Sequence, residues 1–139
     1  FYKRTLSILK NMESEEAKHF VELVPLLITK ETVPEFIFQN NEFFQYNDLQ
    51  TLMDCGIVNS SDGLYTYTGL DQVKLPGFKL VSKNYDVKEL QLEGFALTDA
   101  GLQLCQLIEC NYADENYVKQ LVDRLSRRNN KEISYKKLE

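Results

Sequence analysis

The stretch FALTDAGLQL, from Phe95 to Leu104, decides the fold class of the C-terminal half of the chain. It is typical of a strand that leads directly into a helix. Thr98 is placed to cap that helix, because its hydroxyl can accept a hydrogen bond from a free amide of the first turn. Gly101 lacks a β-carbon and therefore predicts close packing of the helix against the sheet. We expect the helix to run to about Glu109.

A second stretch, LQTLMDCGIV from Leu49 to Val58, predicts a short helix followed by a strand. Asn47 is placed to cap this helix, and Gln50 can reach back toward the cap. Gly56 supplies the left-handed residue with which many helices end. The buried face of the helix is expected to consist of Leu49, Leu52 and Met53.

Further strands and one long helix follow. We expect a turn at Ser61–Gly63, since this stretch combines Ser, Asp and Gly. The strand candidates are Leu64–Thr68, Phe78–Ser82 and Glu89–Phe95. Asp114 is expected to cap the last helix, whose buried side would be Tyr117, Val118, Leu121, Val122 and Leu125. Ile133 and Tyr135 alternate with polar residues, as in a final strand.

The N-terminal part predicts two helices. The first covers Thr5–Met12, and the second begins at Ser14, whose hydroxyl can cap it. Pro25 should kink or break the second helix, and Pro34 is expected to close the helical portion. The apolar stripe of the second helix is Ala17, Phe20, Val21 and Val24. The single histidine, His19, lies about opposite this stripe, and we therefore expect a solvated surface residue.

Aromatic residues are concentrated between positions 35 and 46. They flank the pair Asn40–Asn41, which tolerates positive φ, so a small hairpin is expected here. Large aromatic side chains dominate protein cores, and that is one interpretation of this group. The other is an exposed patch for a protein partner or a second copy of the chain. The group consists of Phe36, Phe38, Phe43, Phe44 and Tyr46.

Together the two quoted stretches resemble a winged helix. In winged-helix domains the helix before a G-I-V-like segment is the recognition helix, and an L-T-x-x-G segment opens the closing helix. The matching segments here are Gly56–Val58 and Leu97–Gly101. The resemblance implies an α+β fold with a small antiparallel sheet. It implies little about the ligand, since this fold serves both DNA and protein contacts.

A second resemblance lies near the N-terminus. The segments RTLSILKNM and SEEAKHF, between Arg4 and Phe20, are similar to the middle of an uncharacterised bacterial family of conserved hypothetical proteins. In that family a helical region precedes a winged-helix-like part. The resemblance implies that the chain is the C-terminal portion of a longer bacterial protein, and it implies no activity. We expect a helical segment at 1–34 packed on a winged-helix-like domain at 35–139.

Composition and charge exclude several classes of protein. The chain has 139 residues, of which 43% are hydrophobic and 27% charged, as in a globular domain. The longest charge-free run of its most apolar stretch, Leu23–Thr29, is far shorter than the ~20 residues of a membrane helix. The three cysteines form no C-x-x-C pair, which favours a reducing compartment. We expect a cytoplasmic protein without membrane contact.

The charge distribution disfavours nucleic acid. The net charge is −5, and residues 31–97 carry ten acidic side chains against four lysines. The expected recognition helix has no Lys or Arg, so its surface would repel a duplex. An alternative positive surface exists on the last helix, where Arg124, Arg127, Arg128 and Lys131 recur at helical spacing. Basic residues near a helix C-terminus also complement the helix dipole without any ligand.

No catalytic grouping can be recognised. A chain with one histidine cannot form a histidine metal cluster, and no phosphate-binding glycine motif is present. Cys105 falls on an apolar face and is expected in the core. We expect no metal and no cofactor. Carboxylates brought together by folding remain open, and a cleft holding two or more of them would favour an enzyme.

These observations lead to one main hypothesis and one alternative. The main hypothesis is a noncatalytic interaction module that binds a protein partner or a second copy through the aromatic group. The alternative is a nucleic-acid-binding winged-helix regulator that uses the basic residues of the last helix.

Overall fold

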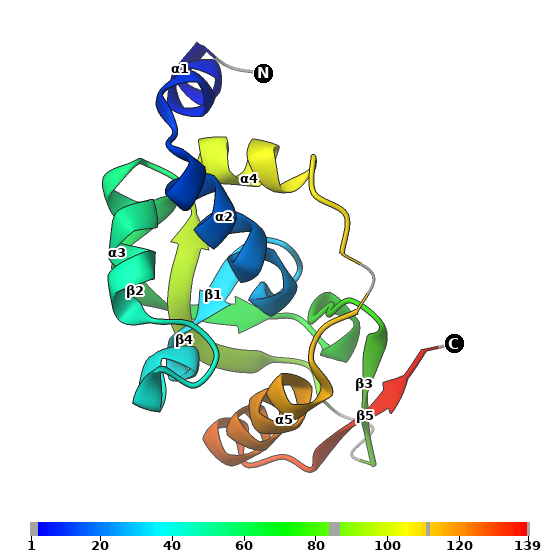
Figure 1. Ribbon diagram of the computed structural model, residues 1–139. Helices are drawn as coiled ribbons and strands as arrows, with labels where there is room; N and C mark the ends of the chain where they lie inside the picture. The colour runs from blue at the N-terminus through cyan, green and yellow to red at the C-terminus, as the bar shows by residue number, and fades with distance from the viewer. Residues whose placement is uncertain (1–2, 84–86, 111, 139) are drawn as a thin grey trace.

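A computed structural model describes residues 3–83, 87–110 and 112–138 and shows an α+β fold (Figure 1). Short 3₁₀ helices, labelled η, lie between the regular elements. In chain order the elements are α1 (Lys3–Asn11), α2 (Ser14–Leu23), η1 (Val24–Leu26), β1 (Thr32–Pro34), η2 (Glu35–Asn41), α3 (Tyr46–Asp54), β2 (Val58–Tyr67), η3 (Leu70–Gln72), β3 (Phe78–Ser82), β4 (Leu90–Leu97), α4 (Asp99–Cys105), α5 (Glu115–Asn129) and β5 (Ile133–Lys137).

The main sheet is small and antiparallel, as expected. Its strand order is β1–β4–β2, so β4 lies in the centre. Phe95 of β4 is paired with Val33 on one side and with Asp62 on the other. A second, two-stranded sheet joins β3 to β5. Figure 1 shows α5 beneath the main sheet, α3 at the left of the sheet and α4 above it, with α2 drawn across the upper part of the sheet.

The two quoted stretches are in direct contact with each other. The Thr98 hydroxyl accepts a hydrogen bond from the Gly101 amide at 3.0 Å, which confirms the predicted cap. It donates to the Gly56 carbonyl at 2.6 Å, while the Thr98 amide donates to the Ile57 carbonyl at 2.9 Å. The start of α4 is thereby tied to the end of α3. Gly56 has φ of 87°, as the predicted left-handed cap requires.

The close packing expected at Gly101 is confirmed. A β-carbon at this position would lie 2.2 Å from the carbonyl oxygen of Ile57. Gly94, in the centre of β4, is similarly confined, since a β-carbon there would lie 2.3 Å from the carbonyl oxygen of Val33. At both positions the obstacle is backbone, which cannot rotate away. Glycine is therefore required for α4 and β1 to approach their neighbours.

Helix α5 has the N-cap and the buried face that its sequence pattern predicts. Asp114 caps α5 by accepting a hydrogen bond from the Asn116 amide at 2.8 Å. Asn130 ends the helix with φ of 52°. The C-terminal strand pairs with β3, with Tyr135 opposite Leu80. The buried residues of α5 are those predicted, namely Tyr117, Val118, Leu121, Val122 and Leu125.

The hairpin expected between 35 and 46 is wrong. Residues Glu35–Asn41 form the 3₁₀ helix η2 instead. The Phe36 ring stacks on Tyr117 of α5 and the Phe38 ring meets Phe95 of β4, so packing on these distant elements sets the conformation of the segment.

Two of the N-terminal expectations need correction, and one is confirmed. Pro25 does end the regular helix, since α2 stops at Leu23 and a 3₁₀ turn follows. The stretch closed by Pro34, however, is strand β1 and not helix, because β4 offers it a free edge. The N-cap of α2 is Glu13 rather than Ser14, and the Glu16 carboxylate accepts a hydrogen bond from the Glu13 amide at 3.0 Å.

Three further boundaries differ in the middle of the chain. The expected turn at Ser61–Gly63 is part of strand β2, whose register shifts between Val58 and Asp62 as in a β-bulge. The N-cap of α3 is Gln45 rather than Asn47. Helix α4 ends at Cys105 rather than Glu109. Beyond Cys105 the amides of Leu107 and Ile108 donate to the carbonyl groups three residues earlier, so the α-helical hydrogen-bond pattern stops there.

Candidate functional site

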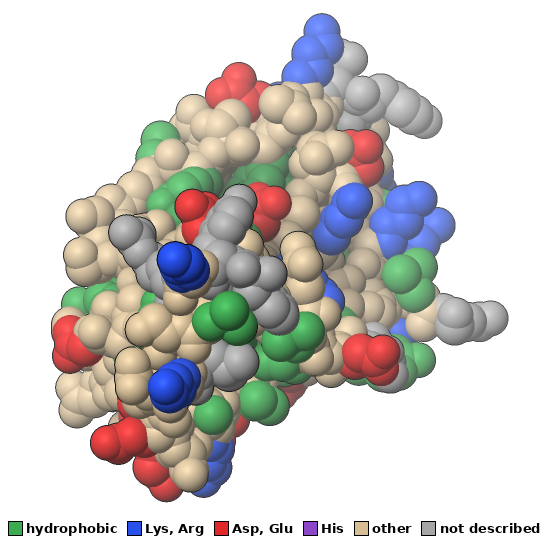
Figure 2. Space-filling view, turned by 90° about the horizontal axis from the view of Figure 1, so that it is seen from above, with side chains coloured by type: hydrophobic (Ala, Val, Ile, Leu, Met, Phe, Trp, Pro, Cys, Tyr) green, Lys and Arg blue, Asp and Glu red, His purple; other side chains and the backbone are tan. Residues whose placement is uncertain are grey.

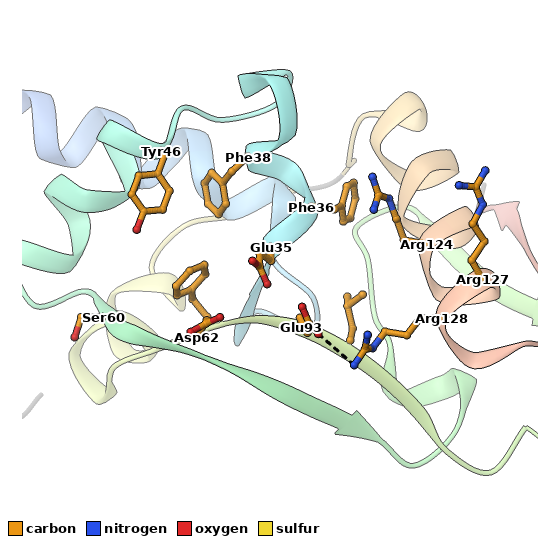
Figure 3. A pocket seen from close by; sticks show the side chains of 12 residues that line it. Glu35, Phe36, Phe38, Tyr46, Ser60, Asp62, Glu93, Arg124, Arg127 and Arg128 are labelled. Carbon is orange, nitrogen blue, oxygen red and sulfur yellow. Dashed lines mark ion pairs between the residues drawn. The ribbon is translucent and has the colours of Figure 1, made fainter.

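An open cleft of about 800 Å³ lies between η2, the sheet and α5 (Figure 3). Five elements contribute to it. Aromatic, acidic and basic side chains meet in this one place. Its lining residues are Glu35, Phe36 and Phe38 of η2, Tyr46 of α3, Ser60 and Asp62 of β2, Leu92, Glu93 and Phe95 of β4, and Arg124, Arg127 and Arg128 of α5.

Aromatic contacts hold η2 against α5. The ring of Phe36 stacks on the fully buried ring of Tyr117, with centroids 5.8 Å apart. Phe43 meets the same tyrosine edge-on at 5.5 Å. The Tyr117 hydroxyl donates to the carbonyl oxygen of Leu26 at 2.5 Å, so α5 is anchored to η1 as well. One wall of the cleft is therefore fixed to the core by a single buried residue.

The C-terminal end of α5 is fixed to β4. The Asn129 side chain accepts from the Gln91 amide at 2.8 Å and donates to the Gln91 carbonyl at 3.1 Å. This two-sided contact places the arginines of α5 beside the outward side chains of β4. Arg128 lies 3.3 Å from the Glu93 carboxylate, as the dashed line in Figure 3 shows. Both partners are about half exposed, so the ion pair orients the side chains more than it stabilises the fold.

A pair of carboxyl groups lies in the middle of the cleft. Oε2 of Glu35 is buried and has no hydrogen-bond donor among the described residues. The Glu35 carboxyl lies beside that of Glu93, and a hydrogen bond between the two would require a proton on one of them. Burial raises the pKa of Glu35, and the hydrogen bond and charge of Glu93 and the charge of Asp62 raise it further. Three carboxyl groups therefore converge here.

The raised pKa of Glu35 has a consequence for stability. A carboxyl whose pKa is higher in the folded state favours folding while it is protonated and costs stability as the pH rises from about 4.5 through its folded pKa. Glutamine mimics the protonated form. We expect the stability advantage of Glu35→Gln over the wild type to grow as the pH rises through this window, and to vanish below it.

Urea unfolding of both proteins between about pH 3 and pH 8 measures this difference. Glu109→Gln, which alters an exposed glutamate outside the cleft, is the matched control. A stability difference between Glu35→Gln and wild type that stays the same at every pH would contradict the account of Glu35.

The aromatic group lies mostly in the core. Phe36 and Phe44 are buried, and Phe38 and Phe43 are partly buried against the core. Tyr46 is the exposed member, at 48%. The ring of Phe38 is central, with Tyr46 at 5.7 Å and Phe95 at 6.1 Å, both edge-on. The group therefore offers the edges of Phe36, Phe38 and Tyr46 to the cleft rather than a broad apolar patch.

The basic residues of α5 do not form an unpaired positive stripe. Arg127 pairs with Asp123 at 3.2 Å, and Arg128 with Glu93. The guanidinium of Arg124 lies 5.9 Å from the centroid of the Phe36 ring, within cation–π range. Lys131 follows the helix and is partly buried, outside the cleft lining. The structure thus brings three of the four predicted basic residues to the predicted aromatics.

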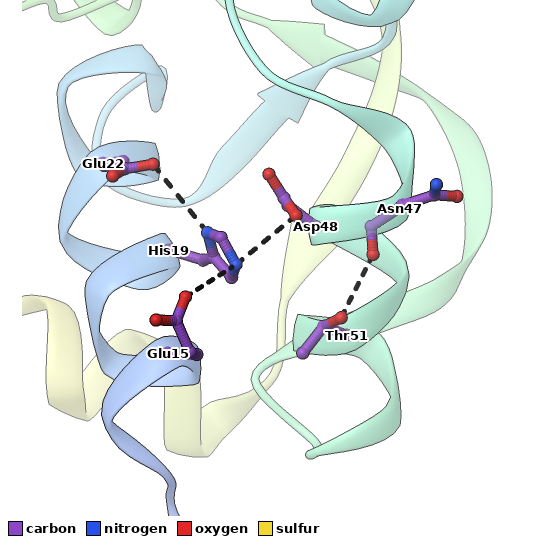
Figure 4. A network of polar contacts seen from close by, with 6 residues as sticks. All are labelled: Glu15, His19, Glu22, Asn47, Asp48 and Thr51. Carbon is purple, nitrogen blue, oxygen red and sulfur yellow. Dashed lines mark hydrogen bonds and ion pairs between the residues drawn. The ribbon is translucent and has the colours of Figure 1, made fainter.

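Helix α3, the expected recognition helix, uses part of its outward face for packing (Figure 4). His19 of α2 lies 3.4 Å from the Asp48 carboxylate and also near Glu15 and Glu22. The side chain of His19 is only 19% exposed, so the expectation of a solvated histidine is wrong. The reason is the rotation of α2, which buries Phe20 and Leu23 and turns His19 toward α3.

Neither the described cysteines nor a metal cluster offers an alternative centre. Cys105 is buried, as expected, and burial raises the pKa of its thiol. Burial and the neighbouring Glu16 raise the pKa of Cys55 to about 11, so it is a thiol at neutral pH. Within residues 3–83, 87–110 and 112–138, no group of three or more metal-ligating side chains could hold a metal ion.

The face of the molecule at the top of Figure 1 carries side chains of mixed character. Figure 2 shows the molecule from above, where Lys and Arg, Asp and Glu, and hydrophobic side chains lie among one another. Two exposed leucines, Leu6 of α1 and Leu107 after α4, come from the elements at the top of Figure 1. Scattered apolar residues of this kind are ordinary on a protein surface.

The carboxylates of the cleft are the residues that sequence reasoning missed. The sequence predicts a turn at Asp62, and no local pattern gives Glu35 a role. Leu90 and Leu92 alternate with Gln91 and Glu93 along the predicted strand. This pattern does indicate that Glu93 faces outward. The sequence does not show which elements face it, because η2 and α5 are far from β4 along the chain.

No family model matches the chain, and neither a curated protein nor a solved structure matches it. In the described part of the chain no helix combines the length and the apolar character needed to cross a bilayer.

Proposed function

We propose that this chain is a noncatalytic interaction module of a longer bacterial protein, and that it binds a segment of a protein partner in the cleft between η2, β4 and α5. The observation that carries the proposal is the convergence of both predicted site groups. Phe36, Phe38 and Tyr46 line the same cleft as Arg124 and Arg127. Aromatic residues and arginine are the side chains most enriched at protein–protein contact sites.

We further propose that the scaffold is winged-helix-like. Helix α3 leads through Gly56 into β2, and β4 leads through Thr98 into α4. The antiparallel strand order β1–β4–β2 supports the same assignment. In this scaffold the cleft lies on the side of η2 and α5, away from His19, which packs on the recognition helix.

Selection from a random-peptide display library tests the proposed function. We expect enriched peptides that bind the wild-type chain and lose binding to Tyr46→Ser, which alters an exposed residue of the cleft. Tyr112→Ser is the matched control, because Tyr112 is similarly exposed outside the cleft. Enrichment of no peptide, or of peptides that bind both variants equally well, would overturn the proposal.

An enzyme is the second candidate, and the carboxyl pair of Glu35 and Glu93 is the observation that favours it. Two carboxyl groups that share a proton can divide acid and base roles. The two carboxyl groups act on each other directly, whereas hydrolytic sites of the glycosidase type hold theirs ~5 Å or more apart. Glu93 is also half exposed in an open cleft, where water weakens electrostatic catalysis. We therefore favour binding over catalysis.

Nucleic acid stays the alternative partner, and it is less favoured. The phosphates of a strand on α5 would lie beside Glu93 and Asp123, which already neutralise two arginines. The test is fluorescence anisotropy of mixed-sequence duplex and single-stranded DNA at low salt. Binding that weakens steeply with salt and is lost on replacing Arg124, Arg127 and Arg128 with Glu would favour this alternative over the protein partner.

We also propose a cytoplasmic location. The support is the state of the three cysteines, Cys55, Cys105 and Cys110, which are all free thiols.

A further inference from the structure

The charges of the cleft are separated along its length (Figure 3). Asp62 lies at the end near Tyr46 and Phe38, and Arg124 and Arg127 lie at the opposite end, on α5. The carboxyl pair and Arg128 lie between the two ends. We call the first the acidic end and the second the basic end. A ligand that fills the cleft therefore meets negative charge on one side and positive charge on the other.

Among the described residues that line the cleft, no Lys or Arg lies at the acidic end. The Asp62 charge acts on Glu35, whose buried Oε2 has no donor among the described residues. Arg128 forms an ion pair with Glu93 and therefore neutralises only one of the three carboxyl groups. Aromatic rings of Phe38 and Tyr46 adjoin this end, and such rings attract ammonium and guanidinium groups. A lysine or arginine side chain of a ligand would supply both the donor and the charge.

The basic end is suited to bind a carboxylate of a ligand. Arg127 is 76% exposed, and its contact with Asp123 is a surface pair one helical turn away. Such pairs contribute little and exchange readily for a better-placed carboxylate. Arg124 is held over the Phe36 ring and is thereby oriented at the cleft wall. Planar guanidinium groups of this kind suit a carboxylate with two parallel hydrogen bonds.

Resting on the proposed function, we propose that the occupant of the cleft is an extended peptide segment of a partner protein that carries a lysine or arginine and, a few residues away, an aspartate or glutamate. The basic side chain enters the acidic end beside Asp62 and reaches toward the Glu35 carboxyl in the middle of the cleft. The acidic side chain reaches Arg124 and Arg127. A nucleic acid strand does not fit this arrangement, because its phosphates would be repelled at the acidic end.

A set of defined peptides tests this inference. The probes are acetylated, amidated nine-residue peptides of Ala and Ser that contain Lys and Glu in either order, two to four residues apart. Matched peptides replace Lys, Glu or both with Gln. Fluorescence anisotropy of the labelled peptides, with the chain added up to millimolar concentration, gives the affinities. We expect the Lys–Glu peptide to bind at least about fivefold more tightly than either singly charged one.

Two variants assign each charge to its end of the cleft. Asp62→Asn should remove the advantage of Lys over Gln and leave that of Glu, whereas Arg127→Gln should do the reverse. Asp54→Asn on α3 and Lys119→Gln on α5 are the controls, because these exposed residues lie outside the cleft. Circular dichroism and urea unfolding confirm that each variant is folded.

The outcomes separate the inference from the proposed function. If display-selected peptides bind the cleft but the Lys–Glu peptide binds no better than the Gln–Gln peptide, the inference is wrong and the interaction module stands. If affinity depends on charge but is unchanged in Asp62→Asn and Arg127→Gln, the inference is wrong as well. If neither the selected nor the defined peptides bind, both proposals are wrong.

Discussion

Gly101→Ala is expected to destabilise the fold by about 3 kcal/mol, the upper end of what overpacking usually costs. The added β-carbon would lie 2.2 Å from the carbonyl oxygen of Ile57. That carbonyl also accepts the hydrogen bond of the Thr98 amide at 2.9 Å, so it cannot move without breaking the joint between β4 and α3. Helix propensity alone would predict the opposite, a gain of about 1 kcal/mol in α4.

The matched control for this substitution is Gly63→Ala in β2. A β-carbon at Gly63 would meet nothing closer than the Tyr65 ring at 3.8 Å, which is ordinary contact. Its stability should therefore stay within about 0.5 kcal/mol of the wild type. Urea unfolding of the two variants gives both free energies. A Gly101→Ala protein as stable as Gly63→Ala would show that α4 does not pack on Ile57 as described.

Tyr117 is the site of the second large effect. Its side chain is fully buried, stacks on Phe36 and donates a hydrogen bond to the Leu26 carbonyl. Tyr117→Phe keeps the ring but leaves the carbonyl without this donor, at an expected cost of ~1–3 kcal/mol. Tyr117→Ala also creates a cavity and should cost ~3–5 kcal/mol. The two variants together separate the hydroxyl from the ring.

The same two variants report on the cleft. Loss of the Tyr117 ring frees Phe36 and with it the guanidinium of Arg124, whereas loss of the hydroxyl leaves both in place. Tyr117→Phe should therefore keep its affinity for a display-selected peptide at a temperature where it is folded. Equal unfolding free energies for Tyr117→Phe and wild type would contradict the hydrogen bond to η1. Weakened peptide binding by Tyr117→Phe would contradict the described support of Phe36.

The fold could be predicted from the sequence where a local pattern decides the structure. The caps at Thr98 and Asp114, the left-handed Gly56 and the apolar face of α5 are short-range features, and all are confirmed. The hairpin predicted at 35–46 is wrong because the conformation of this segment depends on partners distant in sequence. The Tyr117 ring of α5 stacks on Phe36, and the Phe95 ring of β4 meets Phe38.

The candidate site was predicted only in parts. The aromatic and basic groups were recognised as alternatives for two different partners. Their meeting in one cleft follows from the packing of η2 and α5 around β4, which no local pattern contains. The burial of His19 could not be predicted for the same reason. Its side chain packs against α3, which supplies Asp48 and lies distant in sequence. The carboxyl groups of Glu35 and Glu93 are 58 positions apart in the chain and were not associated at all.

The measurement that tests the central claim most directly is a nuclear magnetic resonance titration of the isotope-labelled chain with a display-selected peptide. We predict that the largest shifts of backbone amide signals fall on cleft residues of η2, β4 and α5, such as Phe38, Glu93 and Arg127. Signals of α3 and α4 away from the cleft should change little. Shifts concentrated instead on the outward face of α3, at Asn47 and Gln50, would contradict the account.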